Sequence, residues 1–323
     1  MTARIPDAAY TSIVGLSSSV LRPAILKVAH HPWVEHLATR SRVGRAVADR
    51  FVPGETLAEA LAAARELGDG GIGVMLNHLG ENVTTQREAL DEREAYLAEV
   101  AAAAGTPDLD VVISVKLTQL GLDESVDACR ANLEPVLDAA SASGLTVMID
   151  MEDHTYVDRT LDVFRAAHAR SPSTGLAIQS YLRRTPDDLF SLPSGCRIRL
   201  VKGAYLEPSS IVVGGKREVD RAYTRLFVTA LDRGHRIDVA THDERLQAGV
   251  RERLDGNEEA RSRVEFQMLY GVRRDLQAQL AGQGYPVRVY IPYGTEWYPY
   301  LTRRLAERPA NLWFFISNLV RTR

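Results

Sequence analysis

Apolar residues along the chain recur in short β-branched runs, and each run is followed by a longer stretch with apolar positions at helical spacing. Several runs are almost continuously apolar, which is typical of strands that are covered on both faces. Each run is therefore predicted to be a strand of a buried parallel sheet. The eight predicted strands are residues 71–76, 111–116, 145–150, 175–179, 197–202, 236–241, 263–268 and 286–291.

The stretches between these runs are rich in Ala, Leu and Glu or carry the apolar pattern of an amphipathic helix. Strands that alternate with helices predict a closed (βα)8 barrel, and an open doubly wound sheet is the structural alternative. No repeat or low-complexity linker divides the chain, so residues 1–323 are predicted to form one domain, with residues 1–50 as a helical N-terminal extension. The predicted helices are residues 57–67, 86–104, 123–143, 156–169, 218–233, 243–254 and 272–281.

A glycine-rich stretch before the first predicted strand matches the dinucleotide-binding fingerprint in letters but not in context. Residues 68–73 read Gly-Asp-Gly-Gly-Ile-Gly. The fingerprint requires a strand before the glycines and a helix after them, and here that order is reversed. The glycines therefore predict a helix end and a tight turn rather than a Rossmann site.

Composition and charge are those of an ordinary globular protein. The chain has 323 residues, of which 45% are hydrophobic, and a formal net charge of −3. This apolar content excludes a disordered chain, and the near-neutral charge argues against nucleic acid as a partner, because phosphate binding favours a basic surface. Cys129 and Cys196 lack the spacing of a metal site or a disulfide framework, so we expect reduced thiols in a cytoplasmic protein without a metal.

The apolar stretches near the two ends of the chain do not predict export or a membrane span. Residues 13–29 are interrupted by serines, Arg22, Pro23 and Lys27, unlike the continuous apolar core of a signal peptide. Residues 311–320 are about half as long as a helix that crosses a bilayer. We expect this apolar tail to dock on the barrel, on a partner or on a lipid surface.

Polar and ionisable residues gather where the predicted strands end. In a (βα)8 barrel the carboxyl ends of all strands meet at one mouth, and the active site lies there. Desolvating so many polar groups together is costly without a ligand, so we predict an active site at this mouth. The polar residues at or near the ends of the predicted strands include Lys116, Asp150, Gln179, Arg199, Lys202, Thr241, His242 and Tyr290.

The last helical stretch carries a second polar group. Tyr300, Arg303, Arg304 and Glu307 are spaced so that they share one helix face. Two adjacent guanidinium groups form a good clamp for a carboxylate, because each presents a planar, bidentate fork. A solvated helix with an ordinary ion pair is the alternative interpretation of the same spacing.

Five motifs, in order along the chain, resemble those of the proline dehydrogenase family. The resemblance covers the chain from about residue 54 to its C-terminus, and no aldehyde dehydrogenase half follows, so it points to the single-function bacterial form. The motifs are Ser-Val-Lys-Leu-Thr-Gln-Leu-Gly at 114–121, Ile-Asp-Met-Glu-Asp at 149–153, Arg-Leu-Val-Lys-Gly-Ala-Tyr at 199–205, Thr-His at 241–242 and Tyr-Leu-Thr-Arg-Arg-Leu at 300–305.

The resemblance implies a fold, a reaction and a location. The implied fold is a distorted (βα)8 TIM-type barrel with the last helix over the barrel mouth. The implied reaction is the FAD-dependent oxidation of L-proline to Δ1-pyrroline-5-carboxylate, the first step of proline degradation, with electrons passing on to a quinone. We therefore expect a cytoplasmic protein that contacts the inner face of the membrane peripherally.

The resemblance also implies roles for individual residues. Asp150 and Arg199 are expected to be catalytic, with Arg199 beside the flavin. Leu206 stands where the two-function enzymes have tryptophan, which puts the packing of the cofactor in question. The implied substrate-binding residues are Lys116, Leu269, Tyr290, Tyr300, Arg303 and Arg304. The implied cofactor-binding residues are Ile149, Gln179, Arg199, Lys202, Gly203, Ala204, Thr241 and His242.

The strand-end residues also admit functions of other classes. Asp150, Glu152, His154 and His242 are residue types that suit a metal-dependent barrel hydrolase, although Arg199 and Lys202 would repel a cation. A Schiff-base lyase with Lys116 or Lys202 as the nucleophile is a second alternative. A non-catalytic binding barrel is a third, and it leaves the many ionisable groups without a task.

Overall fold

The computed structural model describes residues 32–80 and 83–306. These residues fall into two compact units, of which the larger is Gly54–Thr295 and the smaller combines the chain up to Pro53 with the chain from Glu296 onward. The predicted organisation as one domain over residues 1–323 stays a prediction. Glu307 and the apolar tail at residues 311–320 lie outside the described residues.

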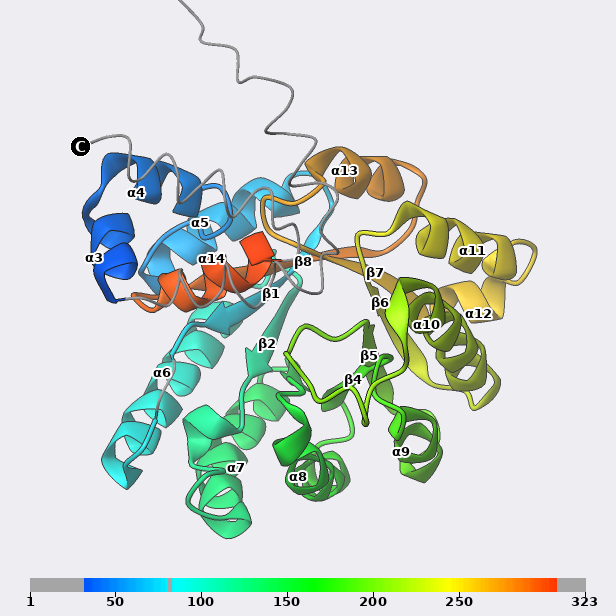
Figure 1. Ribbon diagram of the computed structural model, residues 1–323, viewed down its shortest axis with the longest axis horizontal. Helices are drawn as coiled ribbons and strands as arrows, with labels where there is room; N and C mark the ends of the chain where they lie inside the picture. The colour runs from blue at the N-terminus through cyan, green and yellow to red at the C-terminus, as the bar shows by residue number, and fades with distance from the viewer. Residues whose placement is uncertain (1–31, 81–82, 307–323) are drawn as a thin grey trace, which may run out of the picture. The chain divides into compact units, whose positions relative to one another are not determined.

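The larger unit contains a closed barrel of parallel strands in sequential order (Figure 1). Hydrogen bonds between β1 and β8 close the barrel, so the prediction of a (βα)8 barrel is confirmed and the open-sheet alternative is wrong. Each strand matches its predicted run to within two residues. The strands are β1 (Gly73–His78), β2 (Val111–Val115), β3 (Thr146–Ile149), β4 (Gly175–Gln179), β5 (Arg197–Val201), β6 (Arg236–Ala240), β7 (Val264–Leu269) and β8 (Val287–Tyr293).

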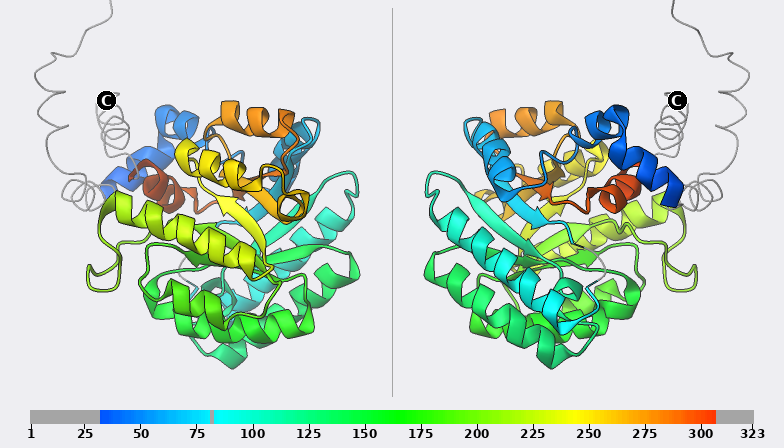
Figure 2. Two further views of the ribbon diagram at one scale, coloured as in Figure 1. Left: turned by 90° about the vertical axis from the view of Figure 1, so that its right-hand side faces the viewer. Right: turned by 90° about the vertical axis from the view of Figure 1, so that its left-hand side faces the viewer.

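Helices surround the strands on the outside of the barrel, as the two side views in Figure 2 show. The helices between β1 and β8 are α6 (Gln86–Ala104), α7 (Val126–Ala142), α8 (Val157–Arg170), α9 (Thr185–Ser191), α10 (Gly215–Asp232), α11 (Glu244–Leu254), α12 (Glu258–Ser262) and α13 (Arg274–Gly282), with single turns η1 (Thr118–Leu120) and η2 (His154–Tyr156). The short helices α9 and α12 were not predicted, because one or two turns carry too little periodicity to detect.

Helix α5 (Leu57–Gly68) precedes the first strand but packs against both β1 and β8. In a regular barrel this place belongs to the helix that follows the last strand. The chain then turns through the glycines, where Gly71 adopts a φ of +70° and Ile72 N–H donates to Leu67 O at 3.1 Å. The glycines therefore end a helix and form a turn, as predicted.

The smaller unit contains three described helices. They are α3 (Pro32–Arg40), α4 (Arg42–Ala48) and α14 (Trp297–Ala306), and α14 contacts both of the others. The predicted placement of the last helix over the barrel mouth stays a prediction. Among the residues that the structure describes, no helix is long and apolar enough to cross a membrane.

The barrel interior has its own apolar layer, separate from the main core. The main core lies between the strands and the surrounding helices and includes Leu76 and Ile149. The interior layer consists of Met75, Val112 and Met148, with Tyr290 packed against it. Because side chains alternate along a strand, the residues two positions later point into the same interior, closer to the mouth. These residues are Asn77, Ser114 and Asp150.

Candidate active site

Asp150 is the centre of the polar cluster at the barrel mouth. Its carboxylate accepts hydrogen bonds from the Arg199 guanidinium, from Ser114 Oγ at 2.6 Å and from Tyr290 Oη at 3.0 Å. Lys116 Nζ lies 3.8 Å from the same carboxylate. Burial acts to raise the pKa of Asp150, but the charges of Arg199 and Lys116 outweigh it, so the pKa lies below its ordinary value. Asp150 is therefore an anion that orders its neighbours.

Arg199 is 7% exposed and lies across the barrel interior. Besides Asp150 it contacts Met75, with Nη1 at 3.0 Å from Sδ, and its guanidinium lies 5.5 Å from the centre of the Tyr290 ring. Its Nε is buried and has no hydrogen-bond partner among the residues that the structure describes. A buried donor without a partner is costly, so this N–H suits an acceptor supplied by a ligand.

Asn77 is a residue of this cluster that the sequence did not single out. It is fully buried, and its Oδ1 accepts a hydrogen bond from Lys116 Nζ at 2.8 Å. Its Nδ2 has no partner in the described part of the chain. The predicted first strand ended at residue 76, and continuing its alternation by two residues from Met75 would have placed Asn77 inside. We refer to Asn77, Ser114, Lys116, Asp150, Arg199 and Tyr290 as the mouth cluster.

Lys202 lies at the end of β5 between two carboxylates. Its Nζ is 2.6 Å from Asp220 and 2.9 Å from Asp243, and Lys216 binds the same two carboxylates. Burial acts to raise the pKa of Asp243, but hydrogen bonds from the two lysines lower it well below its ordinary value. Lys202 is thus held by protein carboxylates at the edge of the mouth.

Gly203 makes a turn that other residues cannot make at this position. Its φ is +112°, and a Cβ at this position would lie 2.2 Å from ring atoms of Tyr181. Tyr181 N–H also donates to Lys202 O at 2.9 Å, which holds the turn against the chain that follows β4. Gly203 and Ala204 are both partly exposed at this turn.

The remaining predicted cofactor contacts form hydrogen bonds within the protein. Gln179 Nε2 donates to Glu152 O at 2.8 Å, and Thr241 Oγ1 accepts from Asp243 N–H at 3.2 Å. His242 Nε2 accepts from Leu269 N–H at 3.0 Å, which places the proton of a neutral ring on Nδ1. These hydrogen bonds fix the side chains of Gln179, at the end of β4, and of Thr241 and His242, directly after β6.

Ile149 and the last helix complete the list of predicted site residues. The Ile149 side chain belongs to the outer core, so only its backbone can serve the mouth. On α14 the Arg304 guanidinium lies 5.6 Å from the centre of the buried Tyr300 ring, as their shared helix face predicts. The Arg303 side chain lies outside the described part of the structure, and the position of the clamp relative to the mouth cluster stays a prediction.

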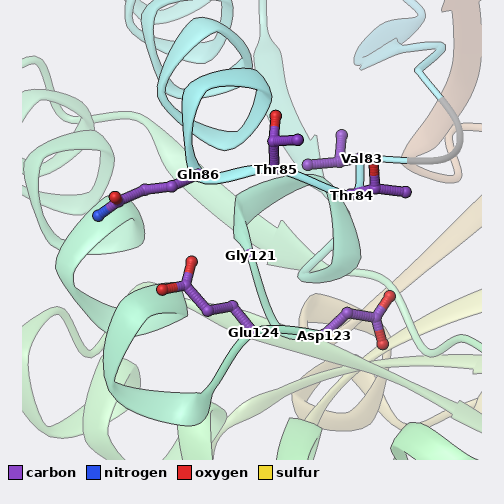
Figure 3. Close-up of a pocket in the computed structure, with 7 residues that line it drawn as sticks. All are labelled: Val83, Thr84, Thr85, Gln86, Gly121, Asp123 and Glu124. Carbon is purple, nitrogen blue, oxygen red and sulfur yellow. The ribbon is translucent and has the colours of Figure 1, made fainter.

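A cavity of about 550 Å³ is lined by seven residues (Figure 3). It opens between the chain that leads into α6 and the chain that leads into α7. Its lining includes Gly121, the last residue of the motif at 114–121, but none of the predicted catalytic, substrate-binding or cofactor-binding residues. Its lining residues are Val83, Thr84, Thr85, Gln86, Gly121, Asp123 and Glu124.

The side chains proposed for a metal-dependent hydrolase have other partners. His154 Nδ1 lies 2.5 Å from Glu207, His242 accepts from Leu269 N–H, and Asp150 binds Arg199. Within the described ranges, no three histidine, cysteine or acidic side chains converge as a metal-binding group. The arrangement instead presents hydrogen-bond donors and two cations to the barrel interior.

Most of the chain matches one protein family and full-length relatives within it. The model of the proline dehydrogenase family matches residues 60–316. A proline dehydrogenase of Deinococcus radiodurans is 39% identical over 308 residues, which cover 93% of this chain and 98% of that protein. Proline dehydrogenase 1 of Bacillus subtilis is 35% identical over 275 residues, which cover 85% of this chain and 91% of that protein.

Solved structures of larger proteins contain a similar fold. Proline utilization A from Bdellovibrio bacteriovorus, inactivated by N-propargylglycine, has a TM-score of 0.76 at 27% identity, over 82% of this chain and 33% of that chain. A variant of proline utilization A from Bradyrhizobium japonicum has a TM-score of 0.68 at 27% identity, over 83% of this chain and 31% of that chain. This chain spans about a third of the length of these solved chains. The predicted resemblance is confirmed, and the chain belongs to the proline dehydrogenase family.

Proposed function

We propose that this protein oxidises L-proline to Δ1-pyrroline-5-carboxylate, the first step of proline degradation, with FAD as the hydride acceptor and a quinone as the final acceptor. The observation that carries the proposal is the contact of Asp150 with Arg199 and Lys116 within the mouth cluster of a barrel of the proline dehydrogenase family. A quinone acceptor in the membrane would require peripheral contact of a cytoplasmic protein with the inner membrane face.

The residues at the mouth fit a flavin. Arg199 Nε and Asn77 Nδ2 are buried donors without partners in the described chain, and a flavin ring offers acceptor atoms along its polar edge. Gly203 and Ala204 form a partly exposed turn that requires glycine at position 203. When bound, a flavin supplies the two-electron acceptor that side chains lack. The residues that would hold it are Ile149, Gln179, Arg199, Lys202, Gly203, Ala204, Thr241 and His242.

The substrate is a small zwitterion, and cationic groups suit its carboxylate. Arg303 and Arg304 would bind the carboxylate as adjacent forks, and Lys116 would add positive charge from the barrel side. Tyr290, Tyr300 and Leu269 would enclose the ring and exclude water. Holding the ring in one orientation removes much of the entropic part of the barrier.

Asp150 orients the two cations of the mouth cluster. It binds Arg199 and lies 3.8 Å from Lys116, so both side chains are held before substrate arrives. Positive charge fixed in advance stabilises negative charge that develops during the reaction without further reorganisation. We assign Asp150 and Arg199 to catalysis in this electrostatic and orienting sense.

The purified protein tests the proposal directly. It is expected to carry the visible absorption of an oxidised flavin, and anaerobic addition of L-proline is expected to bleach that absorption. D-Proline, which reverses the position of the carboxylate relative to the ring, is the matched control and is expected to bleach it far less. A flavin spectrum that L-proline leaves unchanged, or a protein that binds no FAD, would contradict the proposal.

A further inference from the structure

A buried carboxylate outside the mouth cluster joins three loops at the carboxyl ends of the strands. The Glu207 side chain is 1% exposed. It accepts hydrogen bonds from His154 N–H at 3.0 Å, from His154 Nδ1 at 2.5 Å and from Tyr181 Oη at 3.2 Å. Glu207 follows β5, His154 follows β3 and Tyr181 follows β4. We refer to these three residues as the Glu207 clasp.

Tyr181 connects the clasp to the turn at Gly203. Its ring occupies the space that a Cβ of Gly203 would need, 2.2 Å from the position of that atom. Its backbone N–H donates to Lys202 O at 2.9 Å, and its carbonyl accepts from Val213 N–H at 2.8 Å. One residue therefore contacts the loop after β5 at its beginning, at Glu207 and near its end.

The loop between β5 and α10 needs such anchors because it is long and has little apolar packing near its start. It covers residues 202–214, whereas most loops in compact domains have about 4–6 residues. Leu206, directly before Glu207, is 58% exposed and so packs little against the core. A buried carboxylate with three hydrogen bonds to neighbouring loops fixes the backbone where apolar side chains do not.

We propose that Glu207 is a positioning residue, which holds the backbone of Gly203 and Ala204 in the shape that binds the flavin cofactor. The inference rests on the proposed function, because it takes FAD as the ligand of this turn. The Glu207 carboxylate is buried and engaged by protein donors, so it acts through the loop rather than on a ligand. A loop that is ordered beforehand loses less conformational entropy when the ligand binds.

The affinity of the apoprotein for FAD tests the proposal, and quenching of flavin fluorescence measures it. Glu207→Ala is expected to raise the Kd for FAD about tenfold or more, since hydrogen bonds to a charged group are among the stronger ones. Glu207→Gln keeps an acceptor, and Tyr181→Phe removes the hydroxyl that donates to Glu207 but keeps the ring beside Gly203, so both are expected to give smaller increases. Glu218→Gln, on the exposed side of α10, is the matched control and is expected to leave the Kd unchanged.

Two further measurements separate positioning from general damage to the fold. The KM for proline at saturating FAD is expected to stay at the wild-type value, because the clasp acts on the cofactor loop. The Tm of each apoprotein reports loss of stability. A lower Tm with an unchanged Kd for FAD would overturn the proposal.

The remaining outcomes are also decisive. Wild-type Kd values in Glu207→Ala, Glu207→Gln and Tyr181→Phe would overturn the clasp and leave the proposed function intact. If Glu207→Ala does not fold, the other two variants decide in the same way. A wild-type apoprotein that binds no FAD would instead overturn the proposed function and the clasp together.

Discussion

The two ends of the barrel interior both contain buried charges, but they differ in how their hydrogen-bond donors are paired with acceptors. Toward the amino ends of the strands, Arg197 binds Asp238 and Glu265, each at 2.9 Å. Arg288 binds Glu265 at 2.8 Å and Asp110 at 2.7 Å. We refer to these five residues as the basal network, in which each guanidinium contacts two carboxylates.

The mouth cluster at the opposite end has fewer acceptors for its donors. Arg199 and Lys116 share Asp150, and the buried Arg199 Nε and Asn77 Nδ2 have no partners among the described residues. Leaving a buried donor unpaired is costly, and natural proteins tolerate it mainly where a ligand or water completes the bonding. The comparison indicates that the basal network stabilises the barrel, whereas the mouth cluster is arranged for a ligand.

The two buried aspartates show the same contrast in their pKa values. Burial is the main cause that raises the pKa of Asp238 to about 6. The positive charge of Arg197 acts to lower this pKa, and the negative charge of the neighbouring Glu265 acts to raise it. Burial acts on Asp150 too, but Arg199 and Lys116 bring its pKa below the ordinary value. Carboxylates are in excess in the basal network, and cations are in excess in the mouth cluster.

The largest expected effect is on stability, from Arg288→Met in the basal network. The change leaves the largely buried Glu265 and the exposed Asp110 without this cation, and breaking the buried Arg288–Glu265 pair costs about 3–5 kcal/mol of unfolding free energy. Urea unfolding measures the loss. Arg87→Met, at a surface pair that is 83% exposed on the arginine, is the control and is expected to cost less than about 1 kcal/mol. Equal losses for the two variants would contradict the stabilising role of the basal network.

Arg199→Met, in the mouth cluster, is expected to lower activity more than it lowers stability. Removing a preorganised positive group from the site should lower kcat for proline by about 100- to 1000-fold. The unfolding free energy should fall less than in Arg288→Met, because Asp150 keeps Ser114, Lys116 and Tyr290 as partners. Steady-state kinetics and urea unfolding of the two variants serve as controls for each other. A stable Arg199→Met protein with wild-type kcat would contradict the functional role of the mouth cluster.

The raised pKa of Asp238 predicts a pH dependence of stability. The folded state binds this proton more tightly than the unfolded state does, so the unfolding free energy contributed by Asp238 falls as pH rises from about 4 to about 6. Asp238→Asn should flatten the curve in this window, and the exposed Asp91→Asn should not. Urea midpoints measured across the window check this, and identical slopes would show that Asp238 does not carry the effect.

The fold could be predicted from the sequence because strands of a closed parallel barrel are buried on both faces. Runs such as 111–116 and 175–179 are then almost continuously apolar. The polar residues at or near the ends of the eight predicted runs include Lys116, Asp150 and Arg199. The structure brings these three residues together, and with them Tyr290.

Other parts of the site could not be predicted, for physical reasons that differ. Asn77 was missed because two polar residues, Asn77 and His78, continue β1 beyond its apolar run. Glu207 was missed because its partners are 26 and 53 residues away, and no local pattern reports a hydrogen bond between loops. Whether Arg303 and Arg304 face the barrel mouth depends on where α14 is placed, and the spacing of residues along one helix does not determine that placement.

Tyr290→Phe gives the smallest expected effect and the finest test of the comparison. The change removes the hydroxyl that donates to Asp150 at 3.0 Å and keeps the ring that the Arg199 guanidinium contacts. A hydrogen bond to a charged group contributes about 1.5–3 kcal/mol, and the remaining partners of Asp150 offset part of the loss, so we expect about a tenfold fall in kcat/KM.

The matched control for Tyr290→Phe is Tyr223→Phe, which removes a buried hydroxyl that donates to Leu200 O at 3.0 Å outside the mouth cluster. Tyr223→Phe should lower the unfolding free energy and leave kcat/KM near the wild-type value. If the two variants lose stability alike and neither loses activity, Tyr290 is part of the packing only. The evidence that the mouth cluster is arranged for a ligand would then rest on Arg199 Nε and Asn77 Nδ2, the buried donors that have no partners in the described chain.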